Sequence, residues 1–229
     1  MRLERVGDDI WIAEGPQIGF YGLKLTTRAT LARLACGGLW VHSPVVLDED
    51  LARAVDALGP VRALVAPNLE HHLFLAQWIV RYPAAAVHGA PGLAAKRRDI
   101  AFDAELRADS AWAGQIDQAL FPGGEAVFFH RASQTAILTD LIINLPDEGQ
   151  SLLGRLIARA DGIAGPEGGV SRLYRLAMRD RAVAQAAARQ LLAWRPRRAV
   201  FAHGQWYRER ATERLAAQFA WLGAAAAAG

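Results

Sequence analysis

The sequence predicts an α/β fold in which two β-sheets pack face to face and helices cover their outer surfaces. Runs typical of strands come in two blocks, residues 9–43 and 115–139, and helical patterns follow each block. A doubly wound parallel sheet would need a more regular alternation of strands and helices. The 229 residues contain no linker rich in Pro, Ser or Gly. We therefore expect residues 1–229 to form one domain, with 224–229 as a frayed alanine-rich tail.

The first block of strands leads into alternating helices and strands. A hairpin is indicated by Gly37-Gly38, which joins two strand-like runs. The next predicted helix has acidic residues in its first turn and Gly59-Pro60 as its stop. The strands expected here are residues 9–13, 29–34, 39–43, 61–66 and 85–87. The helices expected are residues 48–58, 71–81 and 91–98.

The second block of strands is followed by helices. Its predicted strands are residues 115–120, 126–129 and 135–139. The predicted helices are residues 151–159, 171–194 and 207–222, and one further strand, residues 199–202, separates the last two. This order places two sheets at the centre of the molecule and leaves the helices outside.

Composition excludes several classes of protein. The chain is 52% hydrophobic and 21% charged with a mean hydropathy of +0.09, values typical of a soluble globular protein. No apolar run approaches the roughly 20 residues that span a bilayer, and the N-terminus lacks the apolar core of a signal peptide. We therefore expect a cytoplasmic protein without a membrane partner. Because Cys36 is the only cysteine, any metal must be held by histidines and carboxylates, of which there are 6 His and 23 Asp and Glu.

The net charge of +3 is unevenly distributed. Residues 151–229 hold 13 Arg against 5 acidic residues, whereas residues 1–150 hold 13 basic against 18 acidic residues. These arginines lie in Ala- and Leu-rich helical patterns without an interleaved aromatic platform. A solvated helix face explains them better than a nucleic-acid site, so no nucleic-acid partner is expected. Nothing in the sequence sets the oligomeric state.

Three predicted strand ends carry side chains that bind metals. The loop 66–72, Ala-Pro-Asn-Leu-Glu-His-His, follows a buried strand, Asp140 ends another strand, and His203-Gly204 ends a third. Loops at strand ends can bring distant parts of a chain together, and imidazole with carboxylate is a ligand set for zinc, iron or manganese. A helix N-terminus alone would account for the pair His71-His72; the ordered recurrence of all three features favours a metal site.

This order of motifs resembles the metallo-β-lactamase superfamily, a four-layer αββα sandwich with a His-x-His-x-Asp-His loop, a later His, a bridging Asp and a final His. More closely, four segments resemble an uncharacterised branch of that fold, a domain of unknown function with a Pro-Asn-x-Glu-His-His loop. These segments are Trp40 to Pro44, Val65 to His72, Thr139 to Leu141 and Ala202 to Gly204. The resemblance covers nearly the whole chain.

The resemblance implies one metal ion instead of two. If His72 takes the last position of the loop, His71 takes the Asp position, and no ligand occupies the places of the first metal's histidines, at Pro67, at Leu69 and near residues 122–124. The implied ligands are therefore His71, His72, Asp140 and His203. Zinc is the expected ion, with iron or manganese as alternatives. If the loop is aligned with the superfamily motif using a gap at another position, Asn68, Glu70 and His72 take the places that face the metal.

The resemblance further implies a metal-dependent hydrolase that acts on a small molecule with an ester, thioester or lactam-like bond. Glu70 is the expected proton acceptor, and His130, ten residues before Asp140, is a second acid–base candidate. We expect His42 to support the ligand loop and His88 to be structural. The alternative is a catalytically decayed scaffold or binding protein of the same fold.

Overall fold

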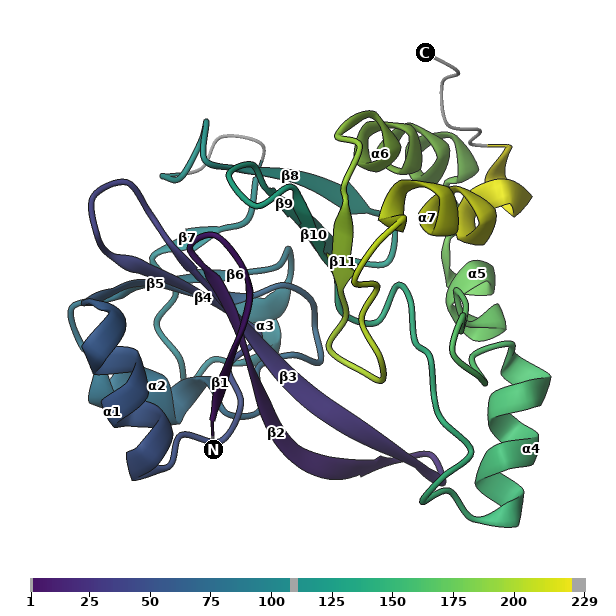
Figure 1. The fold of residues 1–229 in the computed structure, drawn as a ribbon, viewed down its shortest axis with the longest axis horizontal. Coiled ribbons are helices and arrows are strands. Elements are labelled where there is room, and N and C mark those ends of the chain that lie inside the picture. The colour runs from purple at the N-terminus through teal and green to yellow at the C-terminus, as the bar shows by residue number, and fades with distance from the viewer. Residues whose placement is uncertain (1, 108–110, 224–229) are drawn as a thin grey trace.

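Two mixed β-sheets pack face to face in the computed structural model, which describes residues 2–107 and 111–223 (Figure 1). The larger sheet has seven strands in sequence order: β1 (Leu3–Gly7), β2 (Ile10–Phe20), β3 (Leu23–Arg33), β4 (Leu39–His42), β5 (Val61–Ala66), β6 (Ala86–Gly89) and β7 (Ala104–Glu105). The smaller sheet has the order β11 (Arg198–Val200), β10 (Thr135–Ile137), β9 (Glu125–His130) and β8 (Ile116–Phe121). The expected frayed tail, residues 224–229, lies outside the described residues.

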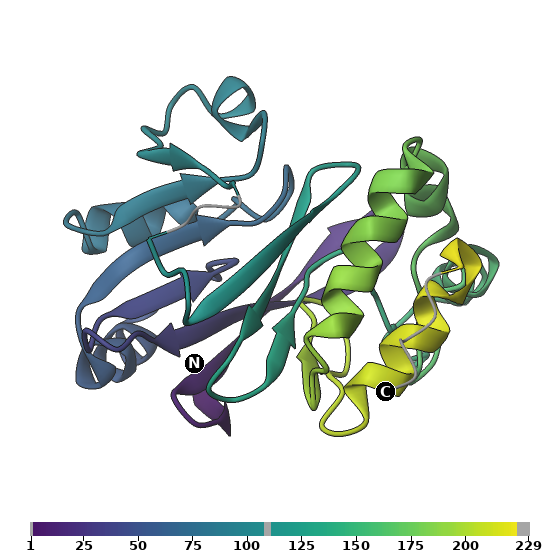
Figure 2. The ribbon, with the colours of Figure 1, turned by 90° about the horizontal axis from the view of Figure 1, so that it is seen from above.

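Helices cover the outer face of each sheet. The larger sheet is covered by α1 (Glu49–Leu58), α2 (Leu75–Arg81) and α3 (Leu93–Lys96). The smaller sheet is covered by α6 (Arg181–Ala193), α7 (Ala211–Phe219) and a 3-10 turn at Ala220–Leu222 (Figures 1 and 2). Of the other two described helices, α4 (Leu152–Asp161) lies beside the end of the β2–β3 hairpin, and α5 (Arg172–Ala177) lies between α4 and α7 (Figure 1). The predicted four-layer αββα sandwich is confirmed.

The interface between the two sheets is an apolar and aromatic core. Trp40 of the larger sheet packs edge-on against Phe128 of the smaller sheet, with 5.0 Å between ring centroids. Ile12, Ile137 and other fully buried aliphatic side chains complete this layer. The β4–β5–β6 pairs are parallel. Parallel strands are covered on both faces, which explains the almost continuous apolar run of β5.

The hairpin of β2 and β3 is much longer than the sequence indicated, because each strand has 11 residues. It extends beyond the sandwich, and its distal half packs against α4 in a separate apolar cluster. The distal half contains Pro16 and two glycines, Gly15 and Gly19, which weaken the strand pattern in the sequence. This extension forms one wall of the pocket described below.

Two predicted helices are shorter than expected. The helix predicted at residues 171–194 is two helices, α5 and α6, because the side chain of Asp180 accepts a hydrogen bond from the Val183 N–H and begins a new helix there. The helix predicted at residues 207–222 begins only at Ala211, because the backbone of Tyr207 pairs with that of Ala199. In both cases a tertiary contact or a cap interrupts a continuous apolar pattern.

The helix predicted at residues 71–81 begins at Leu75. The side chain of Asn68 accepts hydrogen bonds from the backbone N–H groups of Glu70 and His71, at 2.9 and 2.8 Å. These bonds form a local turn in place of the first helical turn. The two adjacent histidines therefore lie on a turn and point in different directions.

No described helix has both the length and the apolar character that crossing a membrane requires.

Candidate metal centre

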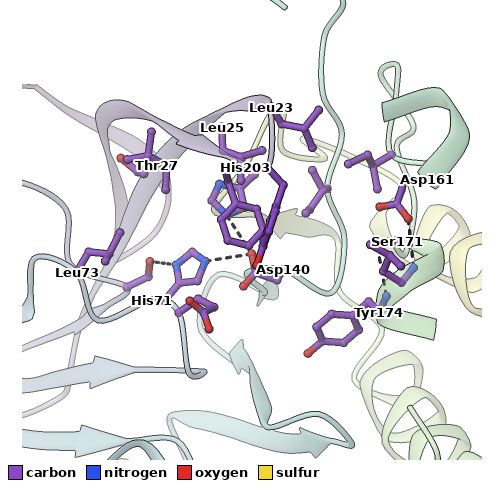
Figure 3. Close-up of a pocket in the computed structure, with 18 of the residues that line it drawn as sticks. Leu23, Leu25, Thr27, His71, Leu73, Asp140, Asp161, Ser171, Tyr174 and His203 are labelled. Carbon is purple, nitrogen blue, oxygen red and sulfur yellow. Dashed lines mark hydrogen bonds and ion pairs between the residues drawn. The ribbon is translucent and has the colours of Figure 1, made fainter. Parts of the chain in front are cut away.

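Side chains from three strand ends meet at one point (Figure 3). His71 lies in the loop after β5, Asp140 after β10 and His203 after β11. Oδ1 of Asp140 lies 3.2 Å from Nε2 of His71 and 3.0 Å from Nε2 of His203. One donor atom from each side chain lies within 4.8 Å of the other two. Among the described residues this is the one group of three such side chains close enough to share an ion.

Backbone groups of β3 and the loop after β11 fix His203. Its Nδ1 donates a hydrogen bond to the carbonyl oxygen of Thr26, and the next N–H, of Gly204, donates to Thr26 Oγ1 at 2.8 Å. The buried guanidinium of Arg28 donates to the Gly204 carbonyl oxygen at 2.7 Å. Gly204 has φ 79°, and a Cβ there would collide with the carbonyl oxygen of Asn144. Only glycine fits this turn, which directs His203 into the pocket.

Two polar side chains hold His71. Oγ of Ser43 lies 2.7 Å from Nδ1 of His71. Ser43 has φ 51°, a left-handed conformation that is uncommon for residues other than glycine. The turn around Asn68 fixes the backbone of His71. With Nδ1 occupied by Ser43, the other ring nitrogen faces Asp140.

Asp140 is held from both sides. Nδ2 of Asn68 donates to its Oδ2 at 2.7 Å. Beneath it, the fully buried carboxylate of Glu125 accepts hydrogen bonds from the backbone N–H groups of Thr139 and Asp140, at 2.8 and 3.0 Å. The hydroxyl of Tyr174 lies 3.4 Å from the same carboxylate. Asn68 therefore joins the His71 turn to Asp140, and Glu125 fixes the backbone that carries Asp140.

Electrostatics keep the central carboxylate charged. Burial alone would raise the pKa of Asp140, but the neighbouring His71 and the hydrogen bond with His203 hold it well below its ordinary value of 3.8. Burial opposes the charged form of His203, yet the hydrogen bond to Asp140 raises its pKa above 6.5. Burial and the charge of Asp140 raise the pKa of Glu125 to about 7, although backbone hydrogen bonds favour its charged form.

The donor set fits a metal ion. Because Nδ1 of His203 carries the proton given to the Thr26 carbonyl, neutral His203 presents the lone pair of Nε2 to a carboxylate oxygen of Asp140. Two lone pairs at 3.0 Å repel each other unless a cation, either a proton or a metal ion, lies between or beside them. In histidines that bind metals, the ring nitrogen that faces away from the metal typically makes a hydrogen bond of its own, as Nδ1 does in His71 and His203.

A pocket of about 480 Å³ opens beside these three side chains. The β2–β3 hairpin forms one wall, and the segment that carries Ser171 and Tyr174 forms the opposite wall (Figure 3). Glu70 and Asp161 also line it. The group of His71, Asp140 and His203, which could hold a metal ion, thus lies at a polar site in an otherwise mostly apolar pocket.

The structure brings together three of the four ligands expected from the sequence. His72 lies outside the group, because its Nδ1 faces Arg97 at 2.6 Å. Burial and the charge of Arg97 lower the pKa of His72. His71, whose identity departs from the Asp of the superfamily motif, is the member of the pair that reaches Asp140. The turn at Asn68 decides between them.

The two expected acid–base residues have different surroundings. Glu70 lines the pocket, and its Oε1 lies 2.9 Å from Nζ of Lys96. His130 is not among the pocket-lining residues. It is buried in β9, with Nδ1 at 2.8 Å from Oγ of Ser133, and burial lowers its pKa. His130 therefore lies apart from the candidate site, and its catalytic role stays a prediction.

The remaining two histidines pack as aromatic rings. His42 stacks on Trp40 with a centroid distance of 5.4 Å, and neither ring nitrogen has a hydrogen-bond partner in the described part of the chain. His42 does not hydrogen-bond to the loop 66–72 as expected, whereas its neighbour Ser43 bonds to His71 of that loop. His88 packs edge-on against Trp112 at 4.7 Å, in agreement with a structural role.

Several residues that shape the site were not identified from the sequence. Glu125 follows Pro-Gly-Gly and looks like an ordinary loop acid. Arg28 looks like a solvent-facing residue of a strand. Thr26 acts partly through its carbonyl oxygen, for which no sequence signal exists. Asn68 did carry a signal, because Pro-Asn before a helical pattern is typical of a side chain that caps a turn.

Solved structures similar to this chain define the class of fold. A metallo-β-lactamase from Pontibacter korlensis is 15% identical and matches 97% of this chain and 98% of that chain, with a TM-score of 0.64. The metallo-β-lactamase FIM-1 from Pseudomonas aeruginosa, in its mono-zinc form, is 13% identical over 97% and 96%, with a TM-score of 0.62. A metallo-β-lactamase from Hirschia baltica is 11% identical over 96% of both chains, with a TM-score of 0.62. The chain therefore has a metallo-β-lactamase fold.

Within this class, residues 7–95 match the family model of a domain of unknown function, DUF4336. This segment includes strands β2 to β6 of the larger sheet and the loop that carries His71. No curated protein matches the chain.

Proposed function

We propose that this protein is a metal-dependent hydrolase with one divalent ion, zinc, held by His71, Asp140 and His203. The convergence of these three side chains in the pocket carries the proposal. A similar fold has been solved as a mono-zinc metallo-β-lactamase. The substrate is a small molecule with an ester, thioester or lactam-like bond.

The residues of the site prepare it for such a reaction. When bound, a divalent ion supplies Lewis acidity, which polarises a carbonyl group and acidifies water. Ser43 and the Thr26 carbonyl hold the outer nitrogens of His71 and His203, so that both Nε2 atoms face Asp140. Hydrolysis adds water across the scissile bond and yields a carboxylic acid and the alcohol, thiol or amine.

Glu70 is the proposed proton acceptor. It lines the pocket, whereas both imidazoles contact Asp140 Oδ1. Its Oε1 also forms an ion pair with Nζ of Lys96 at 2.9 Å, which holds the carboxylate in place beside the pocket. Glu70→Gln should lower kcat about 100-fold or more while metal content stays unchanged, since general bases contribute factors of this order.

Metal analysis of protein purified without a histidine tag tests the proposal. We expect about one zinc per chain after reconstitution, and its loss in His71→Ala and His203→Ala. His72→Ala is the matched control, because it removes an adjacent imidazole that faces Arg97, and it should keep its metal. Failure to take up zinc, iron or manganese, or equal metal content in all four proteins, would contradict the proposal.

The same measurement separates the hydrolase from a decayed scaffold or binding protein of the same fold. A scaffold would hold His203 as an imidazolium paired with Asp140 and would take up no metal. We also propose a cytoplasmic location, because the exposed thiol of Cys36 suits a reducing compartment. We further propose that the protein has no nucleic-acid partner.

A further inference from the structure

The wall of the pocket is mostly aliphatic and aromatic. The distal half of the β2–β3 hairpin contributes one side and the α4–α5 region the other, including Ile18, Leu23, Leu25, Ile157, Ile163 and Leu173. Leu23 and Leu25 point into the same space as His203 (Figure 3). An apolar surface of this extent gains free energy only when a ligand replaces water with apolar atoms of its own.

Apart from the imidazoles of His71 and His203, the ionisable side chains that line the pocket are acidic. Glu70, Asp140 and Asp161 line it, and no lysine or arginine is among its described lining residues. A carboxylate or phosphate placed away from His71, Asp140 and His203 would meet Glu70 and Asp161 without a lysine or arginine among the described lining residues to pair with. The part of the ligand that lies along the apolar wall is therefore uncharged.

Exposed apolar side chains continue the pocket to the surface. Leu73 and Leu173 both line the pocket, yet they remain 57% and 72% exposed. Tyr21, at the tip of the hairpin, lines it as well and is 86% exposed. Large apolar side chains at the mouth of an apolar pocket are typical of sites that take long apolar ligands.

We infer that the pocket binds the alkyl chain of an uncharged carboxylic acid derivative, with its carbonyl group beside His71 and His203. The chain lies between the β2–β3 hairpin and the α4–α5 region. That this ligand is a substrate rests on the proposed function. Binding of the alkyl chain, in contrast, needs only the apolar wall and can be measured without metal.

Calorimetric titration of metal-free protein with 1-butanol, 1-hexanol and 1-octanol tests the inference. These alcohols are neutral and differ only in chain length. Affinity should rise up to about fourfold for each methylene group transferred from water into the apolar pocket, and more than about tenfold from 1-butanol to 1-octanol. Equal affinity for 1-butanol and 1-octanol would overturn the inference.

Two leucines of α5 provide a matched pair of variants. Leu173 lines the pocket and Leu176 does not, although they are 72% and 77% exposed. Leu173→Asp should lower the affinity for 1-octanol about tenfold, whereas Leu176→Asp should leave it within about twofold. Equal effects of the two variants would overturn the assignment. If Leu173→Asp does not fold, Leu73→Asp serves with Leu153→Asp, whose leucine is exposed and outside the pocket, as its control.

The outcomes separate the inference from the proposed function. Protein that binds 1-octanol but never metal keeps the alkyl pocket and contradicts the hydrolase. Protein that binds metal through His71 and His203 but shows no preference for longer alcohols contradicts the alkyl pocket alone. For the metal-loaded protein, kcat/KM should be higher for p-nitrophenyl octanoate than for p-nitrophenyl acetate, and the reverse order would contradict the inference.

Discussion

Two regions of the molecule bury histidines in opposite surroundings. Beside the pocket, His71 and His203 each have a partner at both ring nitrogens, with Asp140 between them. Between the sheets, His42 is as buried as His203 but packs on Trp40 and Phe128, with no hydrogen-bond partner in the described part of the chain.

The difference shows that, among buried histidines, the hydrogen-bond partners of the ring decide what the side chain can do. Burial lowers the pKa of His42 well below 6.5, so that it behaves as a neutral aromatic ring. His203 is 2% exposed, yet its pKa is raised because it bonds to Asp140. A fixed ring beside a carboxylate can bind a cation, whereas a ring among aromatic side chains contributes packing.

The largest effect on stability is expected from replacing Glu125, whose buried carboxylate holds the backbone that carries Asp140. Glu125→Ala would leave the buried N–H groups of Thr139 and Asp140 without an acceptor. Each unsatisfied buried donor costs about 1–3 kcal/mol, so the free energy of unfolding should fall by about 3 kcal/mol. Urea unfolding measures this loss. Glu125→Gln, which keeps one carbonyl oxygen, should lose less, and equal stability of Glu125→Ala and wild type would show that the carboxylate does not hold this loop.

A smaller effect, on zinc affinity, is expected from replacing Asn68, which links two of the proposed metal ligands, His71 and Asp140. Asn68 donates to Asp140 and holds the turn that directs His71. Supporting residues of this kind change metal affinity about 10–100-fold, so Asn68→Ala should weaken zinc binding by that factor. Competition with a chromophoric chelator gives the affinity. If the variant binds zinc as tightly as wild type, the turn does not depend on this side chain.

The smallest effect is expected from His42, the buried histidine without a hydrogen-bond partner among the described residues, and concerns how stability depends on pH. Unfolded chains protonate His42 at its ordinary pKa of 6.5, whereas the folded protein resists protonation because its pKa is lowered. Stability is therefore full above pH 6.5 and falls with decreasing pH, by at most about 1.4 kcal/mol per pH unit for this residue. His42→Phe should remove that share of the slope and change stability little at pH 7.5.

Thermal or urea unfolding of both proteins between pH 7.5 and 5 measures the difference. His88 and His130 also have lowered pKa values and contribute equally to both curves. Parallel curves for the wild type and His42→Phe would mean that His42 is protonated in the folded protein.

Much of the fold could be predicted from local pattern. Helix α1 begins directly after its cap Asp48 and ends before Gly59, close to the expected bounds, because capping and a glycine stop are local effects. The apolar run of β5 identified a strand buried on both faces. The break between α5 and α6 was not predicted, because Ala and Leu continue across Asp180, and the distal half of the β2–β3 hairpin was not predicted either.

The candidate site was predicted in part. Asp140 and His203 were identified because both follow strands, and strand ends converge at one edge of a sheet. The sequence predicted both His71 and His72 as ligands, whereas the turn at Asn68 brings only His71 to Asp140 and leaves His72 beside Arg97. It also missed Glu125 and Arg28, whose partners are backbone groups 14 to 176 residues away.

The sequence by itself determined the order of the elements, the αββα class and the supply of ligands: histidines and carboxylates at strand ends, with a single cysteine. These properties depend on residue type and on spacing along the chain. The tertiary structure decided which imidazole faces Asp140, which histidines are only aromatic packing, and that the pocket is apolar. Those properties depend on which distant groups meet in space, as the Thr26 carbonyl meets His203 and the β2–β3 hairpin meets α4.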